Sequence, residues 1–328
     1  MKRRKIIALL LSLLLITIST AACGNQNGDE LAHDDDATGV EGDGEYRIGM
    51  MVKNRINPYF LEQERGAVEA AERLGIDLVV LATETDDDVE RQIQIAEDLL
   101  AQEYDALIIP PLSSTSIVQF IKQCNDAGVP FINSDTRADE ELMEEIGAES
   151  VFYVGADNYD AGYVAAEGII EAINGSGKVA ILEGTSGADS AEQRLEGFLD
   201  KISEYPDIEI IASQPANYNR SMGYDVFQNM LQANPEMDAL FAANDEMALG
   251  AVEVLEALGQ SGDIPIIGIN YVDEARDAIE AGRMYGSVTQ APYDMGRIAL
   301  EQTIEYLKGN PVEDEYITES VLHTIDNL

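Results

Sequence analysis

The sequence predicts an α/β protein built from two doubly wound parallel-sheet lobes. After residue 45, short apolar runs alternate with amphipathic stretches of helical period. The apolar runs are nearly continuous, as expected for parallel strands covered on both faces. The number of strand–helix units is too large for a single doubly wound sheet, so two lobes, each with its own sheet, fit the pattern best. A single eight-fold barrel is the structural alternative.

Each predicted element follows from its residue pattern. The run at 46–52 is apolar, and the stretch at 58–74 places its apolar residues on one helical face. The stretch at 87–102 does the same. The strands are predicted at 46–52, 76–82, 106–110, 130–134, 152–155, 178–182, 208–213, 239–242, 264–269 and 285–288. The helices are predicted at 58–74, 87–102, 114–127, 160–173, 191–202, 222–233, 246–258, 273–281 and 294–307.

The N-terminus reads as an export signal. Lys2-Arg3-Arg4-Lys5 precedes an apolar run at 6–18, which is short for a membrane-spanning helix of about 20 residues. Thr20-Ala21-Ala22-Cys23 resembles a bacterial lipobox, with Thr20 where leucine is usual. We therefore expect a signal peptide at 1–22, a lipid on Cys23 and an extracytoplasmic protein anchored to the membrane. An ordinary signal peptide with a chance cysteine is the alternative.

Residues 23–45 are polar, acidic and glycine-containing, which is typical of a disordered tether. Asp34-Asp35-Asp36 within it could suggest a cation site. A run of like charges is more often a solvated segment, so we expect no metal there.

The charge balance excludes whole classes of partner. The chain has 62 acidic and 20 basic residues, a formal net charge of −42. Nucleic-acid binding needs lysine and arginine to displace counterions, so we expect none. Such acidity suits a salt-rich habitat, where salt screens the self-repulsion. Two cysteines and two histidines argue against a disulfide framework and a zinc site, and no cofactor is expected.

Polar residues follow the predicted strands in both halves of the chain, where parallel α/β sheets bind ligands. They include Lys53, Asn57, Asp135, Thr136, Asn158, Asn244, Asn270 and Gln290, with aromatic residues Tyr59 and Phe60 nearby. Amides and carboxylates bridge neighbouring hydroxyls, and aromatic faces cover the C–H side of a sugar ring. Helix capping is the alternative role, above all for Asn57 before Pro58 and Asp245 before Glu246.

Several segments together resemble the type I periplasmic solute-binding family, and its ribose-binding members above all. They are Asn57-Pro58-Tyr59-Phe60, Ser213-Gln214-Pro215-Ala216-Asn217-Tyr218-Asn219-Arg220, Phe241-Ala242-Ala243-Asn244-Asp245-Glu246-Met247-Ala248, Ser287-Val288-Thr289-Gln290 and Tyr306-Leu307-Lys308-Gly309. The resemblance runs from Tyr46 to about Asp326. It implies sugar captured between two lobes and delivered to the membrane subunits of an ABC importer, by a monomer.

The resemblance also implies boundaries and contacts. The N-terminal lobe would hold 46–156 and 291–320, and the C-terminal lobe 157–290 and 321–328, joined by a three-segment hinge. Asn57 would bind ligand hydroxyls, and Tyr59, Phe60 and Tyr218 would enclose the ring. The remaining hydroxyl-binding positions are Asp135, Asn244 and Gln290.

Four positions depart from the ribose pattern. Thr136 stands where the family has arginine, with Arg137 one place later, and Glu192 replaces a ligand-binding arginine, whereas Arg194 matches an arginine interpreted as structural. Asn270 replaces an aspartate, and Lys53 replaces a small hydroxyl residue. These exchanges alter the donors and acceptors of the site. They argue against ribose itself, whereas another pentose, a hexose, an inositol-like polyol or an amino sugar would each be compatible. Lys53 could neutralise Glu192.

Three other functions are alternatives to transport. An enzyme is disfavoured because Ser186 has no histidine to activate it, and Cys124 fits a helix interior. A repressor-type core would need a DNA-binding domain where the signal sequence stands. A sensory protein that presents sugar to a membrane receptor is the remaining alternative to transport.

Overall fold

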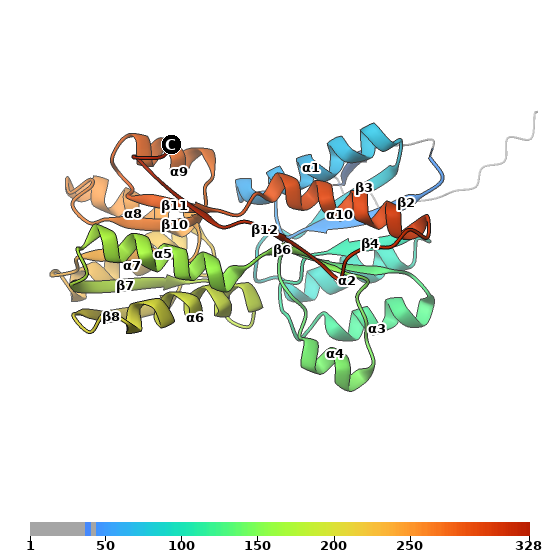
Figure 1. Cartoon of the computed structure of the whole chain (residues 1–328), viewed down its shortest axis with the longest axis horizontal. Helices are drawn as coiled ribbons and strands as arrows, with labels where there is room; N and C mark the ends of the chain where they lie inside the picture. The colour runs from blue at the N-terminus through green and yellow to red at the C-terminus, as the bar shows by residue number, and fades with distance from the viewer. Residues whose placement is uncertain (1–36, 41–43) are drawn as a thin grey trace, which may run out of the picture. The chain divides into compact units, whose positions relative to one another are not determined.

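The computed structural model describes residues 37–40 and 44–328 (Figure 1). The predicted signal peptide, Cys23, Asp34–Asp36 and most of the tether lie outside these residues. The described chain forms two open, mainly parallel sheets with helices on both faces. This confirms the predicted fold class, and the barrel alternative is wrong.

The first lobe, as we name it, is built on a seven-stranded sheet of order β1-β3-β2-β4-β5-β6-β12. Its strands are β1 (Thr38–Val40), β2 (Arg47–Val52), β3 (Asp77–Ala82), β4 (Ala106–Ile109), β5 (Phe131–Ser134), β6 (Tyr153–Ala156) and β12 (Glu315–Thr318). Its helices are α1 (Pro58–Leu74), α2 (Val89–Leu100), α3 (Val118–Ala127), α4 (Glu140–Ile146) and α10 (Pro292–Leu307). All of its strand pairs are parallel except β1 with β3.

The second lobe is built on a six-stranded sheet of order β13-β11-β10-β9-β7-β8. Its strands are β7 (Gly177–Glu183), β8 (Ile208–Pro215), β9 (Ala239–Ala242), β10 (Ile266–Asn270), β11 (Gly286–Thr289) and β13 (Val321–Thr324). Its helices are α5 (Asn158–Ala172), α6 (Asp189–Ser203), α7 (Arg220–Ala233), α8 (Asp245–Leu258) and α9 (Asp273–Glu280). In both lobes the strand order reverses after the first two parallel strands, which is the position where doubly wound sheets bind ligands.

The chain passes between the two sheets three times. It leaves the first sheet after β6, returns after β11 through α10 to β12, and leaves again for β13. Each lobe is therefore assembled from segments far apart in the sequence.

Local chemistry sets the ends and packing of α1. Asn57 caps it by accepting a hydrogen bond from the Tyr59 N–H, Pro58 occupies the first turn, and Gly75 ends it at φ 69°. A Cβ on Gly66 would lie 2.0 Å from the Tyr293 carbonyl oxygen of α10. Glycine is needed there because the two helix backbones touch.

Four elements are absent from the strands and helices predicted above, namely α4, β1, β12 and β13. Strand β13 is short, contains no fully buried residue and pairs antiparallel with β11. Helix α4 buries none of its residues, so it lacks the apolar face that periodicity detects. Strand β12 is short and mostly exposed. Strand β1 lies within the predicted tether and pairs antiparallel with β3, which corrects the expectation of disorder at 38–40. In the part of the chain that is described, no helix has the length and apolarity needed to cross a bilayer.

Candidate functional site

The polar side chains that follow the strands are buried rather than solvated. Ten of the eleven predicted site residues are buried, namely Lys53, Asn57, Tyr59, Phe60, Asp135, Thr136, Tyr218, Asn244, Asn270 and Gln290. The other, Glu192, is exposed on α6. Polar groups are buried at a cost unless they have partners, so the partners of these ten residues define the site.

An ion pair lies at the centre of the first-lobe half. Lys53 Nζ is 2.8 Å from Asp135 Oδ2 and 2.6 Å from Thr136 Oγ1. Burial by itself would raise the pKa of Asp135, but the charge and hydrogen bond of Lys53 outweigh it and lower the pKa. Asp135 is therefore a carboxylate at neutral pH. Lys53 pairs with Asp135 and not with Glu192, which corrects the suggested neutralisation of Glu192.

Two aromatic rings border this pair. Tyr59 and Phe60 meet edge to face at 5.1 Å, and Lys53 Nζ lies 5.8 Å from the Phe60 ring centre. Burial, followed by the Asp135 charge, raises the pKa of Tyr59 well above its usual value. The Tyr59 hydroxyl is therefore neutral and able to donate a hydrogen bond.

Arg194 organises the second-lobe half. Its guanidinium donates to Asn158 Oδ1 at 2.9 Å, to the Ala243 carbonyl at 2.6 Å and to Gln290 Oε1 at 2.6 Å. Gln290 Nε2 in turn donates to Asn158 Oδ1 at 3.1 Å. Arg194 thus joins α5, the end of β9 and the crossing after β11, in agreement with its interpretation as structural.

The capping and binding interpretations of the asparagines turn out to be compatible. Asn244 Oδ1 accepts from the Met247 N–H, and its Nδ2 donates to the Tyr218 carbonyl at 3.2 Å. An amide has two donor hydrogens and two acceptor positions, so one of each is left on Asn244. Capping therefore fixes the side chain without using up its hydrogen-bonding capacity.

Tyr218 is the one predicted ring of the second lobe. Its ring centre lies 5.6 Å from the Arg194 guanidinium carbon, and a Cβ on Gly184 would come within 2.6 Å of its hydroxyl. The Tyr218 hydroxyl is buried and has no hydrogen-bond partner among the described residues. An unpaired buried hydroxyl is unfavourable, and native proteins retain one mainly where it has a function.

Three site residues adopt a backbone conformation that favours glycine. The φ angles are 59° at Asp135, 58° at Tyr218 and 124° at Asn270. Such strain persists only where the surrounding structure enforces it, and it concentrates at functional sites.

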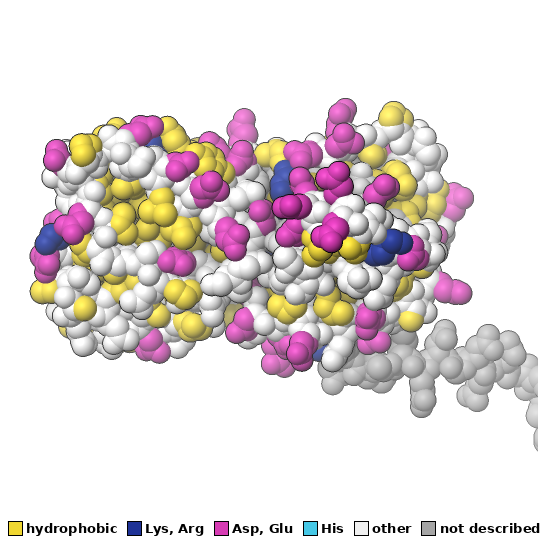
Figure 2. Space-filling view, turned by 90° about the horizontal axis from the view of Figure 1, so that it is seen from below, with side chains coloured by type: hydrophobic (Ala, Val, Ile, Leu, Met, Phe, Trp, Pro, Cys, Tyr) yellow, Lys and Arg dark blue, Asp and Glu magenta, His cyan; other side chains and the backbone are white. Residues whose placement is uncertain are grey.

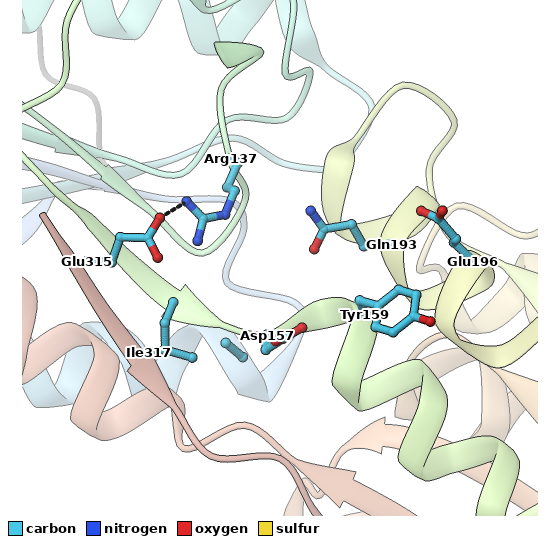
Figure 3. A pocket seen from close by; sticks show the side chains of 8 residues that line it. Arg137, Asp157, Tyr159, Gln193, Glu196, Glu315 and Ile317 are labelled. Atoms are coloured by element: carbon cyan, nitrogen blue, oxygen red, sulfur yellow. Dashed lines mark hydrogen bonds and ion pairs between the residues drawn. The ribbon is translucent and has the colours of Figure 1, made fainter. Parts of the chain in front are cut away.

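Glu192 lines a separate hollow beside this buried set. The hollow has a volume of about 540 Å³ and also receives Arg137 and Glu315 from the first lobe. A neighbouring hollow of about 440 Å³ is shown in Figure 3, where the Arg137–Glu315 ion pair of 2.8 Å faces Gln193, Glu196 and Tyr159. Glu192 is therefore not brought together with the other predicted residues.

The surface carries the acidity of the composition. On the face shown in Figure 2, acidic side chains far outnumber basic ones. Such a surface repels itself, and salt screens that repulsion.

Sequence reasoning missed Asp86 and Ser190 as members of the buried polar set. Asp86 accepts from Asn54 Nδ2 at 2.8 Å, and Ser190 Oγ lies 2.9 Å from Thr136 Oγ1. Asp86 stands in an acidic loop and Ser190 in a helix start, two contexts that usually face solvent. Only the position of Asp86 after a strand could have pointed to it.

Cys124 is buried on α3, as expected of a residue in a helix interior, and burial raises its pKa to about 12. A thiol with such a pKa is protonated at neutral pH and unreactive.

Three buried carboxyl groups predict an unusual pH dependence of stability. Burial raises the pKa to about 6 for Asp86 and Asp245 and to about 7 for Glu246. Each binds its proton more tightly when folded, so stability rises as the pH falls from about 7 toward the ordinary values near 4. The lowered pKa of Asp135 opposes this only below its ordinary value of 3.8. We expect a Tm several degrees higher at pH 5 than at pH 8 in 1 M salt.

Thermal unfolding at fixed salt checks this, with Glu246→Gln as the matched variant. Its Tm should vary less with pH than that of the parent chain. A Tm that falls steadily from pH 8 to pH 5 would contradict the expectation.

Comparison with known proteins identifies the family of the chain. The family model of the periplasmic binding protein domain matches residues 48–311. The D-allose-binding periplasmic protein of Escherichia coli is 31% identical over 82% of this chain and 86% of its own length. The ribose import binding protein of Bacillus subtilis is 32% identical over 82% of this chain and 84% of its own length.

A solved structure shows the same fold. It is the ABC transporter periplasmic solute-binding protein of Actinobacillus succinogenes with bound D-allose, at 34% identity and a TM-score of 0.81 over 86% of this chain and 98% of that chain. The family model covers most of the chain, and relatives above 30% identity align over more than four fifths of it, so the chain belongs to the periplasmic binding protein family.

Proposed function

We propose that this protein captures a sugar or polyol between its two lobes outside the cytoplasm and delivers it to an ABC importer. The observation that carries the proposal is the buried polar set, to which both lobes contribute donors, acceptors and aromatic rings. The relatives named above bind allose and ribose. We place the lobe boundaries at 156/157, 290/291 and 320/321.

The ligand contacts we propose are those with unused hydrogen-bonding capacity. From the first lobe they are Lys53, Asn57 and Asp135, with Tyr59 and Phe60 against the ring. From the second lobe they are Tyr218, Asn244 and Asn270, and Gln290 lies at a crossing. Neither lobe alone can satisfy one ligand, so a ligand shifts the protein toward the closed arrangement. No catalytic step is proposed.

The internal pairing of charges favours an uncharged ligand. Lys53 and Asp135 neutralise each other, and the Lys53 ammonium has a third donor beyond its two observed partners. The Lys53 ammonium can donate to one hydroxyl of a sugar or polyol, and the Asp135 carboxylate beside it can accept from the neighbouring hydroxyl.

Thermal-shift screening tests the substrate class. Pentoses, hexoses, inositols and amino sugars would be added to the lipid-free chain at low and high salt. A ligand present at about 100 times its Kd adds roughly 2.7 kcal/mol of stability. No shift with any sugar or polyol, together with a clear shift for amino acids or peptides, would reject the proposal.

The unpaired Tyr218 hydroxyl yields a prediction with two opposite effects. Tyr218→Phe removes a buried hydroxyl without a partner, so the ligand-free protein should be as stable as the parent or more stable. If the hydroxyl donates to the sugar, affinity should fall by about tenfold. Calorimetric titration and thermal unfolding check the two effects. Unchanged affinity would show that this hydroxyl does not contact the ligand.

We further propose that the protein is a monomer, as the family resemblance implies, and that a lipid on Cys23 anchors it to the membrane. The support is the charged and apolar N-terminal sequence followed by Thr20-Ala21-Ala22-Cys23. Intact-mass measurement of membrane-extracted protein should show a chain that starts at Cys23 and carries a lipid. An unmodified Cys23, or a chain still starting at Met1, would contradict this.

A further inference from the structure

Thr136 is completely buried where the first lobe contacts the second. Its Oγ1 accepts a hydrogen bond from Lys53 Nζ at 2.6 Å and lies within donating distance of two acceptors. One is Asp135 Oδ2 in its own lobe at 3.2 Å, and the other is Ser190 Oγ in the second lobe at 2.9 Å. The single hydroxyl of Thr136 therefore already has three protein partners.

A threonine hydroxyl has only one proton to donate. It can serve Asp135 or Ser190 at a given moment, and Ser190 is within reach only when the lobes meet. Ser190 lies in the first turn of α6 and is itself buried. The acceptor of the Thr136 hydrogen bond therefore depends on whether the second lobe lies against the first.

We propose that Thr136 is a positioning residue that couples lobe closure to the ligand-binding ion pair. When the lobes part, the Thr136 hydroxyl donates its hydrogen bond to Asp135 Oδ2. When they meet, the hydroxyl donates to Ser190 Oγ instead, so Asp135 Oδ2 keeps its contact with Lys53 and can accept a second hydrogen bond from a ligand hydroxyl. The inference rests on the proposed function, because it assigns Asp135 as the ligand acceptor.

Nearby contacts hold the same part of the second lobe. The Asp189 N–H donates to Ser114 Oγ at 2.9 Å, and the Ser114 N–H donates to the Gly187 carbonyl at 3.2 Å. Two hydrogen bonds to Ser114 thus hold the start of α6 on the first lobe. These two contacts and the Thr136–Ser190 contact join the lobes through protein groups, and of the three only the Thr136 contact also touches the ion pair.

The test compares Thr136→Val, which keeps the shape and removes the hydroxyl, with Thr136→Ser, which keeps the hydroxyl. Ser190→Ala removes the second-lobe acceptor and leaves the Lys53–Asp135 pair intact, and Ser203→Ala on the same helix is the control. Stopped-flow kinetics would use the sugar that gives the largest thermal shift. Thr136→Val and Ser190→Ala should dissociate about tenfold faster with an association rate within about twofold, because the lost contact forms after encounter.

Thr136→Ser and Ser203→Ala should dissociate at the parent rate. Equal dissociation rates for Ser190→Ala and the parent would overturn the inference, whatever Thr136→Val does to folding. Small-angle scattering of the ligand-free chains separates this outcome from failure of the proposed function. If no sugar binds, a larger radius of gyration for Ser190→Ala than for Ser203→Ala supports the closure role, and equal radii overturn it.

Discussion

Replacing Lys53 with methionine is expected to abolish sugar binding and to destabilise the protein by about 3–5 kcal/mol. Methionine fills much the same space but leaves Asp135 as an unpaired charge in a buried site. Thr136 also loses its donor. Urea unfolding and calorimetric titration measure the two effects. Lys178→Met is the control, since its ion pair with Glu236 is exposed and should contribute little to stability.

A double-mutant cycle with Asp135→Asn tests whether the unpaired Asp135 carboxylate causes the loss of stability in Lys53→Met. Asparagine tolerates the φ of 59° at this position and is uncharged. If the unpaired carboxylate causes the loss, adding Asp135→Asn to Lys53→Met should recover part of the stability. Strictly additive losses would show that the two side chains act independently.

The second large effect is expected at Arg194. Lysine keeps the charge of arginine but cannot reproduce its planar fork, so Arg194→Lys should leave acceptors unpaired among Asn158, Gln290 and the Ala243 carbonyl. Each buried group without a partner costs about 1–3 kcal/mol. We expect a loss of at least 3 kcal/mol in stability and a large loss of affinity, because Gln290 lies at a crossing between the lobes.

Arg297→Lys provides the matched control. Arg297 also contacts several acceptors, Asp294 and Glu301, but on the surface of α10. Its replacement should change stability by less than about 1 kcal/mol. If Arg194→Lys and Arg297→Lys lose similar amounts of stability, burial of the Arg194 guanidinium is not the reason for its large effect.

The repeated elements could be predicted because burial leaves a periodic trace in the sequence. Parallel strands such as β4 are buried along their whole length, and α2 presents one apolar face. The elements that escaped prediction, α4 and β12, bury little and so leave no such trace. Strand β1 forms by pairing with an edge of the sheet, and three residues in an acidic segment do not reveal that partner.

For the site, the sequence alone determined which residues follow the strands, because the carboxyl ends of parallel strands share one edge of a sheet. It also determined the family, through segments such as Asn57–Phe60. Only the tertiary structure decided which of these groups are paired. Lys53 pairs with Asp135 of its own lobe and not with Glu192. Thr136 contacts Ser190 because the start of α6 lies against the first lobe. Pairing depends on distances of a few ångströms between residues far apart in the chain, and no local pattern encodes those distances.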